Sequence, residues 1–115
     1  MSDACVFCRI AAGEIPSDTV FQDDDVVAFR DLTPRAPTHI LVIPRRHIAS
    51  VAALTEDDAA IAGRLLVTAA RIARDEGIAE AGYRLVANTG RWGGQTVDHL
   101  HLHLMGGRPF DWPPG

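Results

Sequence analysis

Apolar and polar residues follow two different periods along this chain, and each period predicts a different kind of element. Short apolar and β-branched runs, several of them bounded by turn-forming residues, predict strands. These runs cover residues 19–22, 26–30, 39–44, 83–88 and 97–105. Because they lie on both sides of one long helical segment with hairpin-length links, the pattern predicts an α+β fold with a mainly antiparallel sheet.

The long helix is predicted over residues 56–75. Thr55 is suited to cap its N-terminus, and Asp58 follows three residues later, as in a capping box with Asp in place of Glu or Gln. Gly77 is suited to end it, and a shorter helix is predicted over residues 6–12. The core-facing stripe of the long helix would consist of Ile61, Leu65, Ala69 and Ile72.

Length and composition predict one domain over residues 1–115. The chain has 47% hydrophobic and 23% charged residues, which is typical of a soluble globular protein, and its formal net charge is −4. An acidic surface disfavours nucleic acid as a partner, although a local site for one small phosphate stays possible. No signal segment or membrane-length apolar run occurs and the chain has two cysteines, so we expect a cytoplasmic protein.

Three consecutive acids, Asp23-Asp24-Asp25, lie between the first two predicted strands. Carboxylates in a row could bind a divalent metal ion. They are also typical of a solvated hairpin turn, because Asp tolerates turn conformations and caps its own backbone. The position between two short strands favours the turn.

The segment DHLHLHLM, residues 98–105, places three histidines at alternate positions. In a strand, the period of two puts His99, His101 and His103 on one face and the intervening leucines on the other. A helix would scatter the same residues. Since Lys, Thr or Glu would serve equally well on a merely polar face, the pattern indicates a functional surface.

Two functions compete for this face. Same-face neighbours on a strand lie roughly 6.5–7 Å apart, and zinc requires its nitrogens about 2.0–2.1 Å from the ion, so three consecutive histidines cannot easily share one ion. A histidine nitrogen can instead attack phosphorus while a neighbouring imidazole carries protons near neutral pH. The spacing therefore favours nucleophilic and acid–base chemistry.

A glycine-rich loop, NTGRWGGQT over residues 88–96, precedes the histidines. Glycines allow backbone N–H groups to approach an anion closely. The loop lacks the Gly-Lys-Ser/Thr of a Walker motif and would be an ordinary turn in most proteins. Beside three aligned histidines it becomes a candidate phosphate cradle.

QTVDHLHLHL resembles the signature of the histidine triad (HIT) family, in which histidines alternate with apolar residues. The resemblance covers nearly the whole chain, and the WPPG ending favours the Hint branch over the dinucleoside polyphosphate hydrolases. It implies the HIT fold, with a five-stranded sheet, one long and one short helix, and two sheets joined in a homodimer. The other segments that carry it are CVFCRI, EIPS, VVAFRDLTPRAPTHILVIPRRHI, YRLVANTG and GGQ.

The resemblance implies hydrolysis of the P–N bond of purine nucleoside 5′-phosphoramidates of the AMP type, without a metal in the chemistry. His101 would attack phosphorus and form a covalent nucleotidyl-histidine intermediate. His103 and Thr96 would contact the phosphate, and the carbonyl of His99 would hold Nδ1–H of His101.

Two alternative functions stay open. One is a dinucleoside polyphosphate hydrolase or nucleotidyl transferase that uses the same histidine, and the other is a non-catalytic nucleotide- or zinc-binding module.

The resemblance also implies a nucleoside pocket, in which Asp31 binds the ribose hydroxyls and Trp112 approaches the active site of a partner subunit. Without it, the apolar members would be assigned to the core, and Asp31 could cap the loop before Pro34. The implied substrate-binding residues are Phe7, Ile10, Phe29, Asp31, Leu32, Asn88, Gly94, Gln95, Thr96, Val97 and Trp112.

Cys5 and Cys8 form a CxxC motif that could be two free thiols, a redox pair or half of a zinc site. The redox interpretation lacks the βαβ setting of thioredoxins. Resemblance to bacterial relatives with the same CxxC implies a structural zinc ion whose other ligands are His47 and His99. His39 would then stay outside both sites as a hydrogen-bonded structural residue.

Overall fold

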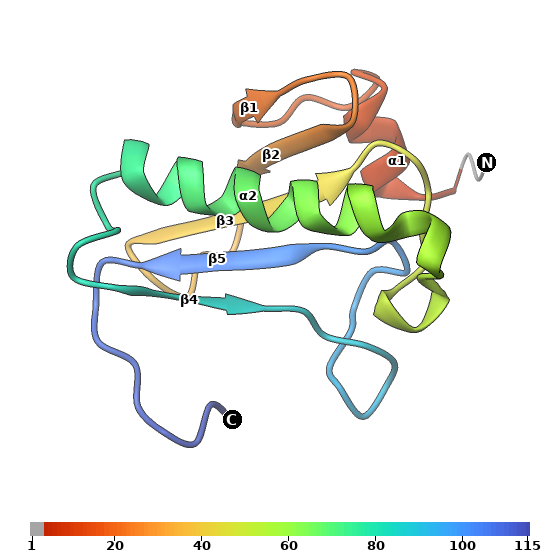
Figure 1. Ribbon diagram of the computed structural model, residues 1–115. Coiled ribbons are helices and arrows are strands. Elements are labelled where there is room, and N and C mark those ends of the chain that lie inside the picture. Colours follow the sequence, from red (N-terminus) through yellow and green to blue (C-terminus); the bar gives the residue numbers. More distant parts are fainter. Residues whose placement is uncertain (1–3) are drawn as a thin grey trace.

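In the computed structural model, which describes residues 4–115, five strands form one antiparallel sheet in the order β1-β2-β3-β5-β4 (Figure 1). The predicted α+β fold is confirmed. The elements in chain order are α1 (Val6–Ala11), β1 (Thr19–Gln22), β2 (Val26–Arg30), β3 (Thr38–Pro44), the 3₁₀ turns η1 (Val51–Ala53) and η2 (Glu56–Asp58), α2 (Ala59–Asp75), β4 (Tyr83–Val86) and β5 (Leu102–Gly106).

Both faces of the central strands are covered, which explains why β2 and β3 are apolar almost throughout. Alternate residues of these strands face opposite layers. On one face, Val26, Ala28, Ile40 and Val42 belong to the same buried cluster as Leu65, Ala69 and Ile72 of α2. On the other face, Val27, Phe29, Leu41 and Ile43 pack with Phe7 and Ala11 of α1.

The long helix begins as predicted but with a tighter first turn. Thr55 and Asp58 form the capping box, in which the Asp58 carboxylate accepts the Thr55 N–H at 2.9 Å. This reciprocal bonding closes residues 56–58 as a 3₁₀ turn, and α2 continues from Ala59. Gly77 then ends the helical region with φ of +77°, a conformation that favours glycine.

The histidine segment is only partly a strand, which corrects the predicted range of 97–105. β5 pairs with β3 from Leu102 onward, whereas the Leu100 N–H donates to the Ile48 carbonyl at 2.6 Å. Val42 and Leu102 are the last pair of the β3–β5 ladder, so the residues before Leu102 have no ladder partner on β3. The alternation persists nonetheless: Leu100, Leu102 and Leu104 all belong to the cluster beneath α2.

Asp23–Asp25 form the connection between β1 and β2, as predicted. One oxygen of the Asp23 carboxylate accepts the backbone N–H groups of Asp25 and Val26 at 2.9 and 2.8 Å, and the other oxygen pairs with Arg64 at 2.7 Å. The carboxylate thus stabilises its own turn and ties it to α2.

Among residues 4–115, no helix combines the length and apolar character that crossing a membrane requires.

Candidate active site

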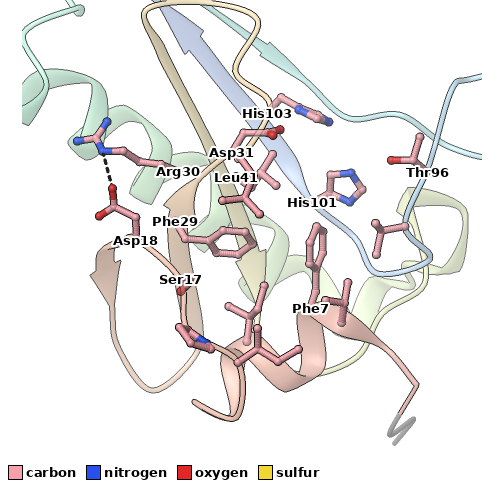
Figure 2. Close-up of a pocket in the computed structure, with 16 residues that line it drawn as sticks. Phe7, Ser17, Asp18, Phe29, Arg30, Asp31, Leu41, Thr96, His101 and His103 are labelled. Atoms are coloured by element: carbon pink, nitrogen blue, oxygen red, sulfur yellow. Dashed lines mark ion pairs between the residues drawn. The ribbon is translucent and has the colours of Figure 1, made fainter.

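A pocket lies between α1 and the sheet face opposite α2 (Figure 2). Phe7 and Phe29 form its apolar middle, with ring centroids 5.4 Å apart in an edge-to-face arrangement. His101, His103 and Thr96 lie at one end of the pocket. The predicted substrate residues that line it are Phe7, Ile10, Phe29, Asp31, Leu32, Thr96 and Val97.

The pocket also contains residues that sequence analysis did not single out as contacts. Ile15, Pro16, Ser17 and Asp18 come from the loop before β1, and Ser17 and Asp18 lie at the end of the pocket away from His101 (Figure 2). Val6 begins α1, Arg30 ends β2, and Leu41 lies in β3 opposite His103. These residues reach the pocket only through the tertiary fold, so no local pattern marks them as contacts.

The hydrogen bond of His101 leaves one of its ring nitrogens with a free lone pair. Its Nδ1 lies 2.7 Å from the carbonyl oxygen of His99, and because a carbonyl can only accept, Nδ1 carries the proton. In the neutral ring, Nε2 then has a free lone pair. The ring is 5% exposed and packs edge-to-face against Phe7 with a centroid distance of 5.1 Å, which limits its rotation.

A second chain of hydrogen bonds fixes the opposite tautomer on His103. The Arg35 N–H donates to Nδ1 of His39 at 3.0 Å, so the proton of neutral His39 is on Nε2. That Nε2–H donates to Nδ1 of His103 at 2.9 Å. Nε2 of His103 therefore carries a proton and can donate to a phosphate oxygen, whereas Nε2 of His101 can attack.

Burial keeps these imidazoles neutral. Desolvation, followed by the neighbouring charges of His101 and His39, lowers the pKa of His103 to about 4. Desolvation also lowers the pKa of His39, against the opposing effect of Asp31. At pH 7 both rings are neutral, as the hydrogen-bond chain from Arg35 requires.

Sequence analysis placed His39 outside both sites as a hydrogen-bonded structural residue, and the structure shows it bonded to the Arg35 N–H and to Nδ1 of His103. It is buried, and Asp31 Oδ2 lies 3.4 Å from its Nε2. Asp31, His39 and His103 are close enough to suggest a metal site. Their protonation argues against it, because Nε2 of His39 faces the other two residues with a proton rather than a lone pair.

The glycine-rich loop is held by Gln95. Its side-chain oxygen accepts the Gly90 N–H at 2.9 Å, and its amide nitrogen donates to the carbonyls of Ala49 and Val97 at 2.8 and 2.9 Å. At Gly93 a Cβ atom would lie 2.3 Å from the Thr89 carbonyl oxygen, so the loop requires glycine there.

Four predicted substrate residues do not line this pocket, namely Asn88, Gly94, Gln95 and Trp112.

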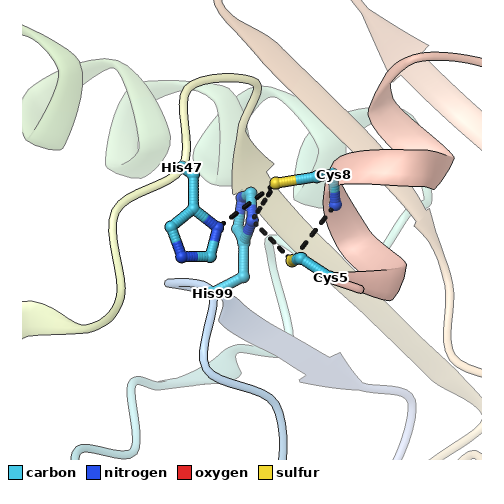
Figure 3. Close-up of side chains that lie close together, drawn as sticks. All are labelled: Cys5, Cys8, His47 and His99. Atoms are coloured by element: carbon cyan, nitrogen blue, oxygen red, sulfur yellow. Dashed lines mark hydrogen bonds between the residues drawn. The ribbon is translucent and has the colours of Figure 1, made fainter. Parts of the chain in front are cut away.

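The remaining histidines meet the two cysteines in a separate cluster behind His101 (Figure 3). Nδ1 of His99 lies 3.4 Å from Sγ of Cys5 and 3.5 Å from Sγ of Cys8. Nδ1 of His47 lies 3.2 Å from Sγ of Cys8. The four donor atoms all lie within 4.8 Å of one another, so the cluster could hold a metal ion.

This donor set fits zinc. In a tetrahedral site with the usual Zn–S and Zn–N lengths, sulfur and nitrogen ligands are about 3.5 Å apart, close to the three distances in the cluster. Nε2 of His99 donates to the Pro44 carbonyl at 2.8 Å, which leaves Nδ1 with its lone pair toward the sulfurs. The ring of His99 thus faces the cysteines while its carbonyl holds His101.

Comparison with known proteins identifies the family of this chain. The chain is 53% identical to the purine nucleoside phosphoramidase of Escherichia coli K12 over 110 residues, which are 96% of this chain and 92% of that protein. It is also 53% identical to an uncharacterised HIT-like protein of Synechococcus elongatus over the full length of both chains. The crystal structure of a HIT family hydrolase from Legionella pneumophila superposes with a TM-score of 0.95 at 51% identity, covering 96% of this chain and 99% of that one. The HIT domain model matches residues 12–110, and the chain therefore belongs to the HIT family.

Proposed function

We propose that this protein hydrolyses the P–N bond of purine nucleoside 5′-phosphoramidates. The observation that carries the proposal is the hydrogen bond from Nδ1–H of His101 to the His99 carbonyl, which leaves an unprotonated nitrogen beside a nucleoside-sized apolar pocket. The relative in Escherichia coli, which is named for this activity, supports the choice of substrate.

In the proposed reaction, Nε2 of His101 forms a bond to phosphorus, and the P–N bond to the amine breaks as the amine takes up a proton from solvent. Nε2–H of His103 and the hydroxyl of Thr96 donate to the phosphoryl oxygens, where negative charge increases. Water then attacks the phosphorus, the P–Nε2 bond breaks and the water gives up a proton to solvent, which releases the nucleoside monophosphate and restores neutral His101. Asp31, at the pocket wall, would hold the ribose hydroxyls.

Turnover tests this proposal. We expect the wild type to release amine from a fluorogenic adenosine or guanosine 5′-phosphoramidate many times per chain, and His101→Ala to lose this activity while its circular dichroism spectrum stays unchanged. Free imidazole added to His101→Gly should restore part of the rate. A protein that binds AMP without turnover is a binding module, and one that cleaves dinucleoside polyphosphates faster than phosphoramidates belongs to the other enzyme class; either result overturns the proposal.

We propose that Cys5, Cys8, His47 and His99 bind a zinc ion and that its role is structural. Four protein donors leave no open position for a substrate, which distinguishes a structural site from a catalytic one. Metal analysis of protein purified without added zinc should give about one zinc per chain for the wild type and almost none for Cys5→Ser. Equal metal content in the two proteins would contradict the assignment.

We propose further that a second copy of this chain covers β4 and the exposed side of α2. β4 is an edge strand, and an unpaired edge can extend the sheet into a partner. Close to it, Leu66 and Val67 of α2 are 53% and 60% exposed, and an apolar groove is lined by Val51, Leu65 and Ala87, among other residues. A continuous apolar surface that includes a strand edge is suited to a two-fold dimer.

Light scattering after size-exclusion chromatography tests the dimer. We expect twice the chain mass for the wild type and a shift toward the monomer for Leu66→Glu, because the charge would be buried in the interface. Ala12→Glu adds the same charge at an exposed position after α1 and should leave the mass unchanged. A dimeric Leu66→Glu variant would place the contact elsewhere.

A further inference from the structure

We propose that Arg108 is a positioning residue for the reaction at His103. Its side chain holds the backbone of Arg35, whose N–H group determines which ring nitrogen of His39, and through it of His103, carries the proton. The effect on rate rests on the proposed function, since it takes Nε2–H of His103 as a donor to phosphate. Arg108 itself lies outside the pocket.

The chain that follows β5 runs against the loop that precedes β3. The ladder between the two strands extends to Gly106. Next to it, Gly107 has φ of +90° and approaches Pro37 so closely that a Cβ atom on the glycine would lie 2.8 Å from Cβ of the proline. Arg108 then donates from Nε and Nη2 to the Arg35 carbonyl at 3.1 and 2.9 Å. The contact between the two segments therefore continues beyond the sheet.

Side chains hold the backbone of Arg35 on both sides. This residue lies between Pro34 and Pro37, which have no N–H group to donate to a ladder. Its own N–H donates to Nδ1 of His39 at 3.0 Å, and its carbonyl accepts the two donors of Arg108. Because both groups belong to one residue, a fixed carbonyl also limits rotation of the N–H away from His39.

Two arrangements of protons are compatible with the 2.9 Å contact between His39 and His103. In the first, Nε2–H of His39 donates to Nδ1 of His103, and Nε2 of His103 carries a proton. In the second, Nδ1–H of His103 donates to Nε2 of His39, and Nε2 of His103 would present a lone pair to phosphate. The second arrangement also places a proton on Nδ1 of His39, directly against the Arg35 N–H. The position of that N–H therefore selects the arrangement that can bind phosphate.

The ring of Phe110 provides a matched control for Arg108. The guanidinium carbons of Arg108 and Arg84 lie 4.2 and 5.1 Å from its centroid. Each of these two guanidinium groups donates to a backbone carbonyl, but Arg84 bonds to Asp111 within the C-terminal segment itself, at 2.7 Å. Arg84→Met thus removes a cation and a contact of the same segment without releasing Arg35.

Proton–nitrogen correlation spectra of the histidine rings test the arrangement directly, because they distinguish a protonated ring nitrogen from one with a lone pair. The chain has five histidines, and comparison with His103→Asn identifies the signals of His103. We expect a proton on Nε2 of His103 in the wild type and in Arg84→Met, and a mixture of both tautomers in Arg108→Met. Arg108→Lys keeps one donor for the Arg35 carbonyl and should lie closer to the wild type. Unchanged His103 signals in Arg108→Met, or the same change in Arg84→Met, overturn the proposal.

Kinetics test whether Arg108 acts through His39. We expect kcat of Arg108→Met to fall about five-fold with little change in KM, since water can replace an exposed guanidinium and Asp31 Oδ2, 3.4 Å from Nε2 of His39, favours the same proton arrangement. Combined with His39→Met, the substitution should cause no further loss, because the residue through which it acts is already absent. An additional loss in the double variant overturns the proposal. If the wild type hydrolyses no phosphoramidate, the proposed function fails and the spectra alone decide the role of Arg108.

Discussion

His99 and His101 are two residues apart, share a hydrogen bond and lie in different chemical environments. The ring of His99 is fully buried between two cysteine sulfurs and the Pro44 carbonyl. The ring of His101 lines a pocket and is bound through Nδ1 to a carbonyl. In each ring a carbonyl oxygen fixes the proton on one nitrogen, which is Nε2 in His99 and Nδ1 in His101. The other nitrogen keeps its lone pair. In His99 this is Nδ1, which faces the cysteine sulfurs, and in His101 it is Nε2. The same type of side chain therefore meets two chemical environments within three residues of one segment.

We expect the largest difference between stability and turnover in His47→Ala. This substitution removes a side chain of the cysteine cluster, and His47 does not line the pocket. We expect loss of zinc and a fall in Tm of about 10 °C or more, because structural zinc contributes directly to folding free energy. Turnover per folded chain should stay within about ten-fold of the wild type. Calorimetry and active-site titration measure the two effects, and a stable variant without turnover would show that the environments are not separable.

The next effect concerns the hydrogen bond that orients His103. His39→Met removes the donor to Nδ1 of His103, so we expect kcat to fall about 10- to 100-fold with little change in KM. His39→Gln keeps an N–H donor at a similar distance from the backbone and should restore most of kcat. Equal losses in the two variants would assign His39 to packing alone.

Acid should lower the stability of the folded protein through His103, and the sign follows from the lowered pKa of this residue. His103 titrates near pH 4 in the folded protein and near 6.5 when unfolded, so the unfolded state binds more protons between these values. The free energy of unfolding should therefore decrease as pH falls from about 6.5 to about 4. Urea titrations at pH 7 and pH 5 should show a smaller decrease for His103→Asn than for the wild type, and identical decreases would contradict the assignment.

The smallest of these effects should follow Gln95→Ala, which removes three hydrogen bonds that hold the glycine-rich loop. We expect a loss of about 1–3 kcal/mol in the free energy of unfolding and a few-fold rise in KM, because Thr96 follows directly. Gln95→Glu keeps the acceptor for Gly90 and should lose less. A rise in KM without loss of stability would instead support the predicted direct contact between Gln95 and the substrate.

Sequence periodicity predicted the fold well where the local residue preferences and the tertiary packing favour the same element. β1 and β2 match their predicted ranges, and the capping box at Thr55 and Asp58 occurs as expected. The strand at the histidines was predicted too long because alternation gives the face of each residue and not its pairing partner. Residues 97–101 keep the alternation without a ladder, since β3 pairs only with the segment from Leu102 onward.

The candidate site was predictable where one segment carries it and unpredictable where distant segments meet. The alternating histidines are visible in sequence, whereas the resemblance supplied the zinc ligand set. The importance of His39 depends on the Arg35 N–H and on pairing of β3 with β5, which no local pattern reveals. The contribution of the loop before β1 to the pocket is equally hidden, because Ser17 and Asp18 resemble any other surface residues until the fold places them at its end.

Leu100 is the single residue that separates the two environments, and its side chain is buried beneath α2. Inserting or deleting one residue between His99 and His101 would turn one imidazole into the hydrocarbon layer and one leucine toward the substrate. The segment can therefore accept exchange of one aliphatic side chain for another, but its length is fixed.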